Sequence, residues 1–365
     1  MNEPLREHRL LRDAEGRVDI KCFDRPGLER FFEDVLDEPA RRAVKVYKWL
    51  WQKDARTFAE MADVAGVVRR KLAEHAYISR LEPDLTLNAE DGTLKVLWKL
   101  EDGLRIESVL IPDGHRLTLC MSSQVGCAMA CTFCLTGDLG LKRHLKPSEI
   151  AMQPLQIGKL LPEGQRITNL VLMGMGEPLH NLSNLVTALR VCLDDHALNF
   201  SHRKVTVSTV GLVPRMAELA AALPVNLAVS LNATTEAQRR EIMPITRKHS
   251  LDELMAACRS FPLPSGKRIT FEYVMFAGFN DTLEDAERLR VLLQGIPAKL
   301  NLIPYNENPE RDLRRPSEDV VKTFQHYFVS RGLHCSVRTT RGIDISAACG
   351  QLGKAREQAL GAGVA

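Results

Sequence analysis

Four cysteines lie within fifteen residues, in the segment CMSSQVGCAMACTFC at residues 120–134. Cys127, Cys131 and Cys134 form the pattern C-x3-C-x2-C, whereas Cys120 stands seven residues before the first of them. Structural zinc takes four ligands, commonly as two C-x2-C or C/H pairs, and no second pair follows at a matching spacing. Three cysteines on one loop can instead hold three irons of a 4Fe–4S cube and leave the fourth iron open. We therefore expect an iron–sulfur cluster, with zinc or an inert structural cluster as the alternative.

An open iron can bind the amino and carboxylate groups of S-adenosylmethionine (SAM). Electron transfer to the sulfonium then cleaves SAM and gives a 5′-deoxyadenosyl radical. The spacing C-x3-C-x2-C is the hallmark of the radical SAM superfamily, and here it follows the first strand of a β/α run. The segment LVLMGMGEPL at residues 170–179 lacks the third glycine of a dinucleotide fingerprint. We interpret it as a strand end whose backbone and Glu177 bind the amino group of the methionine moiety; an ordinary turn is the alternative.

The elements that must position these residues alternate between strands and helices from residue 116 to about 306. Six candidate strands read RLTLCMSS, ITNLVLMG, RKVTVSTVG, VNLAVSLNA, RITFEYVMF and KLNLIPYN. This alternation predicts an α/β fold with a parallel sheet, and six units are fewer than the eight of a closed barrel. We therefore expect a partial (β/α)6 barrel whose site gathers at the strand ends, where Glu177, Ser208, Asn232 and Asn306 fall.

Four segments follow from these patterns. Residues 1–85 read as a small helical accessory domain whose basic residues either face solvent or dock RNA. Residues 86–115 alternate apolar and polar positions around two Asp-Gly pairs, at residues 91–92 and 102–103, which predicts a β-hairpin extension. Residues 116–315 would form the partial barrel, and residues 316–365 a helix, a strand and a cysteine-bearing loop.

Composition narrows the setting but leaves the substrate open. The net charge of +3 is a weak lean toward polyanions. The charged N-terminus lacks the apolar core of a secretory signal, and no run of eighteen apolar residues predicts a membrane span. We therefore expect a cytoplasmic protein that does not associate with a membrane. In that compartment its nine cysteines are not expected to form a static disulfide framework. Cys22, Cys192, Cys258 and Cys335 read as small core residues.

Five motifs together resemble one family. They are CMSSQVGCAMACTFCLTG, MGMGEPL, STVG, LIPYN and DISAACGQL, and the likeness to the RlmN/Cfr radical SAM methyltransferases covers roughly residues 20–352. GMGEPL and EYVMFAGFND are more similar to the RlmN branch, which methylates carbon 2 of adenine, than to the Cfr branch, which methylates carbon 8. The resemblance implies an enzyme that modifies an adenine in 23S ribosomal RNA and an adenosine in the anticodon loop of certain transfer RNAs.

The resemblance also implies roles for individual residues. Cys127, Cys131 and Cys134 would ligate the cluster. The family's SAM contacts match Gly176, Glu177, Ser208, Ser230, Leu231, Asn232 and Asn306. Asn232 is a departure, because the family often has His there; Asn still offers a donor and an acceptor.

Adenine carbon 2 is electrophilic, so ordinary methyl transfer from a sulfonium fails and a radical route is needed. In the family a methylated cysteine supplies the carbon, and Cys349 in AACGQL matches it. A second thiol, Cys120, would then attack the sulfur of Cys349, release the product and leave a disulfide. Cys120 or Glu107 would accept the C2 proton; an ordinary strand carboxylate is the alternative for Glu107.

The implied partners are 23S rRNA, transfer RNA and a low-potential electron donor such as a flavodoxin, acting with a monomer that carries a 4Fe–4S cluster and SAM. Candidate phosphate contacts are Lys142, Arg143, Lys146, Arg314, Arg315, Arg338 and Arg341. Two alternatives stay open. One is a Cfr-type C8 methyltransferase, and the other is a non-catalytic iron–sulfur protein that binds RNA or senses redox state.

Overall fold

The computed structural model describes residues 12–264, 266–308 and 311–353. Its strands are β1 (Val18–Asp19), β2 (Ala76–Tyr77), β3 (Glu82–Asn88), β4 (Leu94–Lys99), β5 (Arg105–Asp113), β6 (Arg116–Cys120), β7 (Gln124–Val125), β8 (Arg143–His144), β9 (Asn169–Leu172), β10 (Val205–Thr209), β11 (Asn226–Ser230), β12 (Ile269–Met275), β13 (Ala298–Pro304) and β14 (Cys335–Val337). Its α-helices are α1 (Arg25–Asp34), α2 (Ala43–Trp51), α3 (Gly66–His75), α4 (Leu135–Asp138), α5 (Pro147–Leu160), α6 (Leu182–Leu193), α7 (Val213–Ala222), α8 (Glu236–Ile242), α9 (Leu251–Ser260), α10 (Leu283–Leu292) and α11 (Glu318–Val329).

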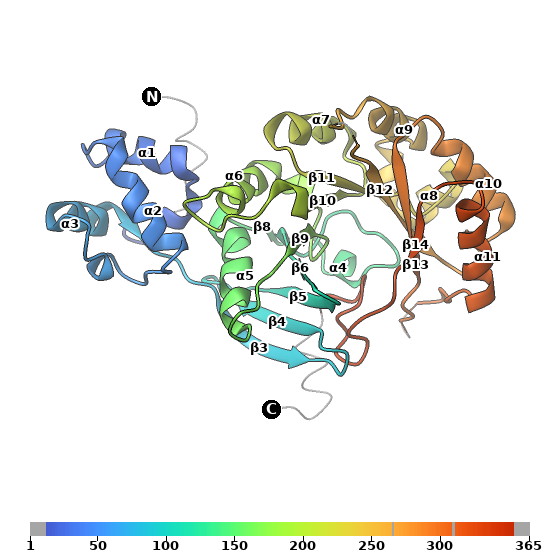
Figure 1. The fold of residues 1–365 in the computed structure, drawn as a ribbon, viewed down its shortest axis with the longest axis horizontal. Coiled ribbons are helices and arrows are strands. Elements are labelled where there is room, and N and C mark those ends of the chain that lie inside the picture. The colour runs from blue at the N-terminus through green and yellow to red at the C-terminus, as the bar shows by residue number, and fades with distance from the viewer. Residues whose placement is uncertain (1–11, 265, 309–310, 354–365) are drawn as a thin grey trace.

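One ten-stranded sheet dominates the molecule, in the order β14-β13-β12-β11-β10-β9-β6-β5-β4-β3. The strands from β6 to β14 pair in parallel, and helices lie on the outer side of the curve that they form (Figure 1). The predicted partial barrel is confirmed, and β14 adds a seventh parallel strand to the six predicted units. Because β14 and β3 are the two edges of the sheet, the barrel is open.

Local sequence explains these elements. Residues 205–209, VTVST, are rich in β-branched side chains, which favour a buried strand. Several helices begin at a residue whose side chain accepts a hydrogen bond from the first turn, among them Thr235, Ser250, Thr282 and Ser317. Cys22, Cys192, Cys258 and Cys335 are buried, as expected for core residues.

The strands β3, β4 and β5 extend the sheet beyond β6 in antiparallel fashion. The two Asp-Gly pairs lie in the turns that join these strands, as the sequence predicts. After β14 the chain runs back to this extension, where Figure 1 shows the red C-terminal segment beside β4 and β5. This returning segment brings residues 342–353 to the open side of the barrel.

The N-terminal helices α1, α2 and α3 enclose a core that includes Phe32, Tyr47 and Trp51. Ion pairs join this segment to the barrel: Asp54 contacts Lys159 of α5, and Arg25 contacts Asp194 at 2.8 Å. No helix in the described ranges is long and apolar enough to cross a membrane.

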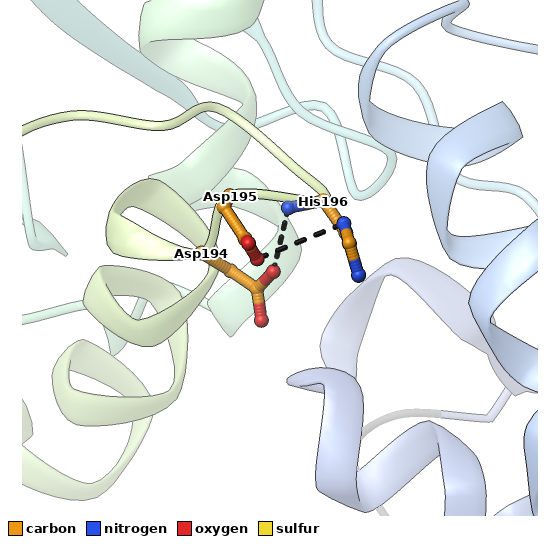
Figure 2. A group of neighbouring side chains, drawn as sticks. All are labelled: Asp194, Asp195 and His196. Carbon is orange, nitrogen blue, oxygen red and sulfur yellow. Dashed lines mark hydrogen bonds and ion pairs between the residues drawn. The ribbon is translucent and has the colours of Figure 1, made fainter.

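Figure 2 shows Asp194, Asp195 and His196 at the end of α6, facing the N-terminal helices. Their ligand atoms lie within 4.8 Å of one another. Both oxygens of Asp194 already have protein partners, the backbone N–H of His196 and the guanidinium of Arg25. We therefore interpret this group as a structural contact that holds the N-terminal segment against the end of α6.

Candidate active site

A cavity of about 160 Å³ opens at the carboxyl ends of the parallel strands. Its lining includes nine of the residues singled out from the sequence: Cys127, Cys131, Cys134, Gly176, Glu177, Ser208, Ser230, Asn232 and Cys349. Four others lie near it without lining it: Cys120, Glu107, Leu231 and Asn306. The cavity therefore joins the C-x3-C-x2-C loop to a cysteine more than two hundred residues away.

The loop with three cysteines runs between β7 and β8. Its backbone is fixed by hydrogen bonds from the N–H of Cys127 to the carbonyl of Gly140 and from the N–H of Cys134 to that of Cys131. The three cysteines line one cavity from one loop. Structural zinc takes four protein ligands, whereas three thiolates can hold a 4Fe–4S cluster whose fourth iron stays open.

Burial raises the pKa of Cys127 to about 12 and also raises the pKa of Cys131 and Cys134. A buried thiolate is costly without a compensating cation. The donor set therefore suits a positively charged group that binds all three sulfurs.

Gly176 brings the chain unusually close to β7. A Cβ there would lie 2.5 Å from the Cβ of Gln124, and the φ of +102° is one that side chains rarely allow. Gln124 in turn accepts a hydrogen bond from the N–H of Glu177 at 2.8 Å. The two oxygens of Glu177 accept from the N–H groups of Leu179 and Val210. Burial raises the pKa of Glu177 to about 7, and these hydrogen bonds hold its carboxyl at the cavity wall.

Asn232 lies just beyond β11 with φ of +58°. Asn adopts this left-handed conformation more readily than most residues, which gives a backbone reason for Asn at this position. Its side-chain oxygen accepts from the N–H of Val274 at 2.9 Å, so the amide joins the ends of two neighbouring strands. Leu231 is fully buried beside it and donates its N–H to the carbonyl of Glu272.

Arg239 binds the ends of these strands, and this role was not predicted from the sequence. It lies in α8, is 1% exposed, and donates to the carbonyls of Val210, Ser230 and Leu231. In sequence it is one of two adjacent arginines in a helical pattern that is typical of a solvated face. Its role depends on carbonyls from two other strands, which only the fold brings together.

Cys349 is half-buried and lines the cavity, and its carbonyl accepts from the side chain of Asn306 at 3.2 Å. Asn306 therefore supports the loop in this structure, and its role as a SAM contact stays a prediction.

Cys120 ends β6 and is 5% exposed. Burial, and after it the neighbouring Cys349, raise its pKa to about 12. Both cysteines are free thiols. The two cysteines that would form a transient disulfide are thus neighbours in the fold.

Arg338 and Glu272 are two further charged residues of the cavity wall. The nearby Cys349 raises the pKa of Arg338, and the carboxylate of Glu272 raises it as well. The sequence suggested Arg338 as a phosphate contact and did not suggest Glu272. Their position beside Cys349 shows that the wall here is polar.

Glu107 lies on β5, is 1% exposed, and does not line the cavity. One oxygen accepts from the N–H of Gly353 at 2.9 Å, and the other lies 3.6 Å from the ammonium of Lys95. Its predicted role as a proton acceptor stays a prediction.

Two family models match the chain. The Radical SAM superfamily model covers residues 121–290, and the model of the ribosomal RNA large subunit methyltransferase N-terminal domain covers residues 18–78. Among solved structures, a radical SAM methyltransferase from Sphaerobacter thermophilus superposes with a TM-score of 0.85 at 38% identity, covering 92% of this chain and 98% of that one.

Curated relatives are more similar still. The dual-specificity RNA methyltransferase RlmN of Pelobacter propionicus is 50% identical over 337 residues, which is 92% of this chain and 96% of the relative. That of Geobacter sulfurreducens is 51% identical and covers 92% of both chains. The chain therefore belongs to the RlmN family of dual-specificity RNA methyltransferases, within the radical SAM superfamily.

Proposed function

We propose that this enzyme methylates carbon 2 of an adenine in 23S rRNA and of an adenine in transfer RNA, through a methylated Cys349. The observation that carries the proposal is the cavity itself, which Cys349 lines together with Cys127, Cys131 and Cys134. Cys120 neighbours Cys349 but does not line the cavity. This position suits a residue that acts only after the base is attached.

The cavity fits a 4Fe–4S cluster and SAM. Cys127, Cys131 and Cys134 would hold the cluster, because all three line the cavity and their buried thiolates need a cationic partner. The strand ends with Gly176, Glu177, Ser208, Ser230 and Asn232 would hold SAM, supported from behind by Leu231 and Asn306. When bound, these groups supply a methyl group to a thiolate and then a radical that removes hydrogen from that methyl.

The chain's own residues would do the rest. Cys349, as a thiolate, accepts the methyl group and later carries the carbon that bonds to the base. Cys120 attacks the sulfur of Cys349, so that the S–S bond forms as the S–C bond to the base breaks, and the released carbon gains a proton. Glu107 or Cys120 would accept the C2 proton, and the unpaired electron left by the radical addition would have to leave the base, with the oxidised cluster as its acceptor, before the closed-shell product forms. Each turnover leaves a disulfide, so a low-potential donor such as a flavodoxin would have to reduce it as well as the cluster.

RNA would approach over a surface that is basic in places. Arg17, Arg56, Arg69 and Arg70 line one hollow on the N-terminal segment, which supports RNA docking by residues 1–85. Lys146 and Arg143 are less available, because they pair with Glu101 and Glu149. We further propose that the rest of the chain divides into a β-hairpin extension at residues 86–115, the barrel at residues 116–315 and a C-terminal segment at residues 316–365. We also propose that the enzyme acts as a monomer in the cytoplasm.

Anaerobic incubation with SAM and dithionite tests whether the centre is catalytic. The wild-type protein should release 5′-deoxyadenosine, because an open cluster iron lets SAM be cleaved reductively. Cys131→Ala should lose iron and release none, whereas Cys192→Ala, at a buried cysteine remote from the cavity, should behave as wild type. A protein that binds iron and RNA but releases no 5′-deoxyadenosine would instead be the redox sensor or RNA-binding protein left open above.

A further inference from the structure

A buried ion pair lies under the loop that carries Cys349. Lys95 on β4 and Glu107 on β5 are each 1% exposed, and their charged atoms are 3.6 Å apart. In the antiparallel register Glu107 faces Leu97, so Lys95 is its diagonal neighbour on the same face of the sheet. Burying two charges costs free energy that their attraction only partly offsets. Such a pair is expected to serve something other than stability alone.

Both charged groups reach the returning segment. The ammonium of Lys95 donates to the carbonyl of Ser346 at 3.0 Å, and Glu107 accepts from the N–H of Gly353 at 2.9 Å. Ser346 is three residues before Cys349 and Gly353 is four residues after it. The pair therefore binds the loop on both sides of the cysteine.

The loop adopts a conformation that its sequence alone does not favour. Ser346 has a φ of +50°, in a region that costs a non-glycine residue on the order of 1 kcal/mol. Gly353 has a φ of +125°, and a Cβ there would lie 2.8 Å from a methyl carbon of Leu139. External contacts must therefore hold the loop in place, and the carbonyl of the strained Ser346 is one of the two points that the ion pair holds.

Other contacts do not replace this one. The extension also binds the start of the loop, through the N–H of Gly342 to Asp91 and the N–H of Glu90 to Asp344. On the barrel side, the carbonyls of Cys349, Gly350 and Leu352 accept from Asn306, Leu135 and Thr136. None of these contacts binds Ser346 or Gly353, whereas the ion pair binds both.

We propose that Lys95 is a positioning residue, which with Glu107 holds residues 346–353 so that Cys349 faces the cavity beside Cys120. This inference rests on the proposed function for the role of Cys349, but the contacts themselves do not. It also gives Glu107 a second duty. Replacing Glu107 would then lower activity through the lost anchor as well as through any lost proton acceptor. Replacing Lys95, which does not line the cavity, removes only the anchor and so distinguishes the two effects.

Hydrogen–deuterium exchange on the purified full-length protein tests the anchor without turnover. Lys95→Met should raise exchange in peptides spanning residues 346–353 by about tenfold or more, because Ser346 loses its donor and Glu107 loses its counter-ion. Lys99→Met, at an exposed lysine of the same strand, is the matched control and should leave these peptides unchanged. Exchange within twofold of wild type in Lys95→Met would overturn the proposal.

The double variant Lys95→Met/Glu107→Gln guards against simple misfolding. It removes both buried charges of this pair, and the Gln oxygen can still accept from the N–H of Gly353. The exchange rate of the loop should therefore be lower than in Lys95→Met and closer to that of the wild type. If the increase in exchange of the double variant equals the sum of the increases of Lys95→Met and Glu107→Gln, the two residues act independently. That result would contradict the proposal that they hold the loop as a pair.

Kinetics separate positioning from a purely structural effect. Lys95→Met should lower kcat at least tenfold with a nearly unchanged KM for SAM, and Lys95→Arg should recover most of the loss. If KM for SAM rises instead while kcat is unchanged, Lys95 does not position Cys349. A wild-type protein in which Cys349 is never methylated would overturn the proposed function, and the exchange experiment would still decide the anchor.

Discussion

Replacing Cys120 by alanine should convert the enzyme into one that stops as a covalent protein–RNA adduct. Methyl transfer to Cys349 and attachment to the base do not need Cys120, but release of the product requires a second thiol to attack the sulfur of Cys349. Cys349 raises the pKa of both Cys120 and Cys134, and of these two neighbours Cys120 is the one that is not a proposed cluster ligand. Product should therefore fall below one equivalent per enzyme.

Denaturing gel electrophoresis with labelled RNA measures the adduct directly. Cys335→Ala provides the matched control, since Cys335 is equally buried on β14 and plays no part in the proposed reaction. The alanine substitution at Cys120 should cost little stability beyond a small cavity. Normal turnover by Cys120→Ala, with no adduct, would show that another group releases the product.

Replacing Cys349 by alanine should abolish RNA methylation at the first step. The sulfur of Cys349 is the proposed carrier of the new carbon, and the cavity offers the other three lining cysteines to the cluster. Intact-protein mass spectrometry after incubation with SAM should detect a methyl group on wild type and none on Cys349→Ala. Because Cys349 is half-buried, the variant should fold, with a loss of stability on the order of 1 kcal/mol or less.

The control for this experiment is Cys258→Ala, at a buried cysteine of α9. It should retain both protein methylation and RNA methylation. Methylated RNA from Cys349→Ala would mean that carbon reaches the base without this cysteine, and the proposed route would be wrong.

Much of the barrel could be predicted because its signals are local. Strand patterns such as VTVST and the spacing of Cys127, Cys131 and Cys134 depend on neighbouring residues only. A strand was also predicted in residues 316–365, but its place as a seventh parallel strand was not, because the pairing of β14 with β13 joins residues that are distant in sequence. The Asp-Gly pairs placed the hairpin turns for the same local reason.

The supporting charges could not be predicted, because their partners are distant in sequence. Lys95 meets Ser346 across 251 residues, and Arg239 meets carbonyls on strands that precede it. In sequence both residues read as ordinary surface charges. Arg143 illustrates the reverse case: it was predicted as a phosphate contact, and in the structure it forms ion pairs with Asp102 and Glu149.

Mass spectrometry of modified nucleosides tests the central claim most directly. The purified enzyme, supplied anaerobically with SAM and a reductant, would be given unmodified 23S rRNA and, separately, transfer RNA, and each digest compared with standards. The proposed function predicts 2-methyladenosine in both RNAs. The appearance of 8-methyladenosine in place of 2-methyladenosine would contradict it and assign the enzyme to the C8 chemistry of the Cfr branch.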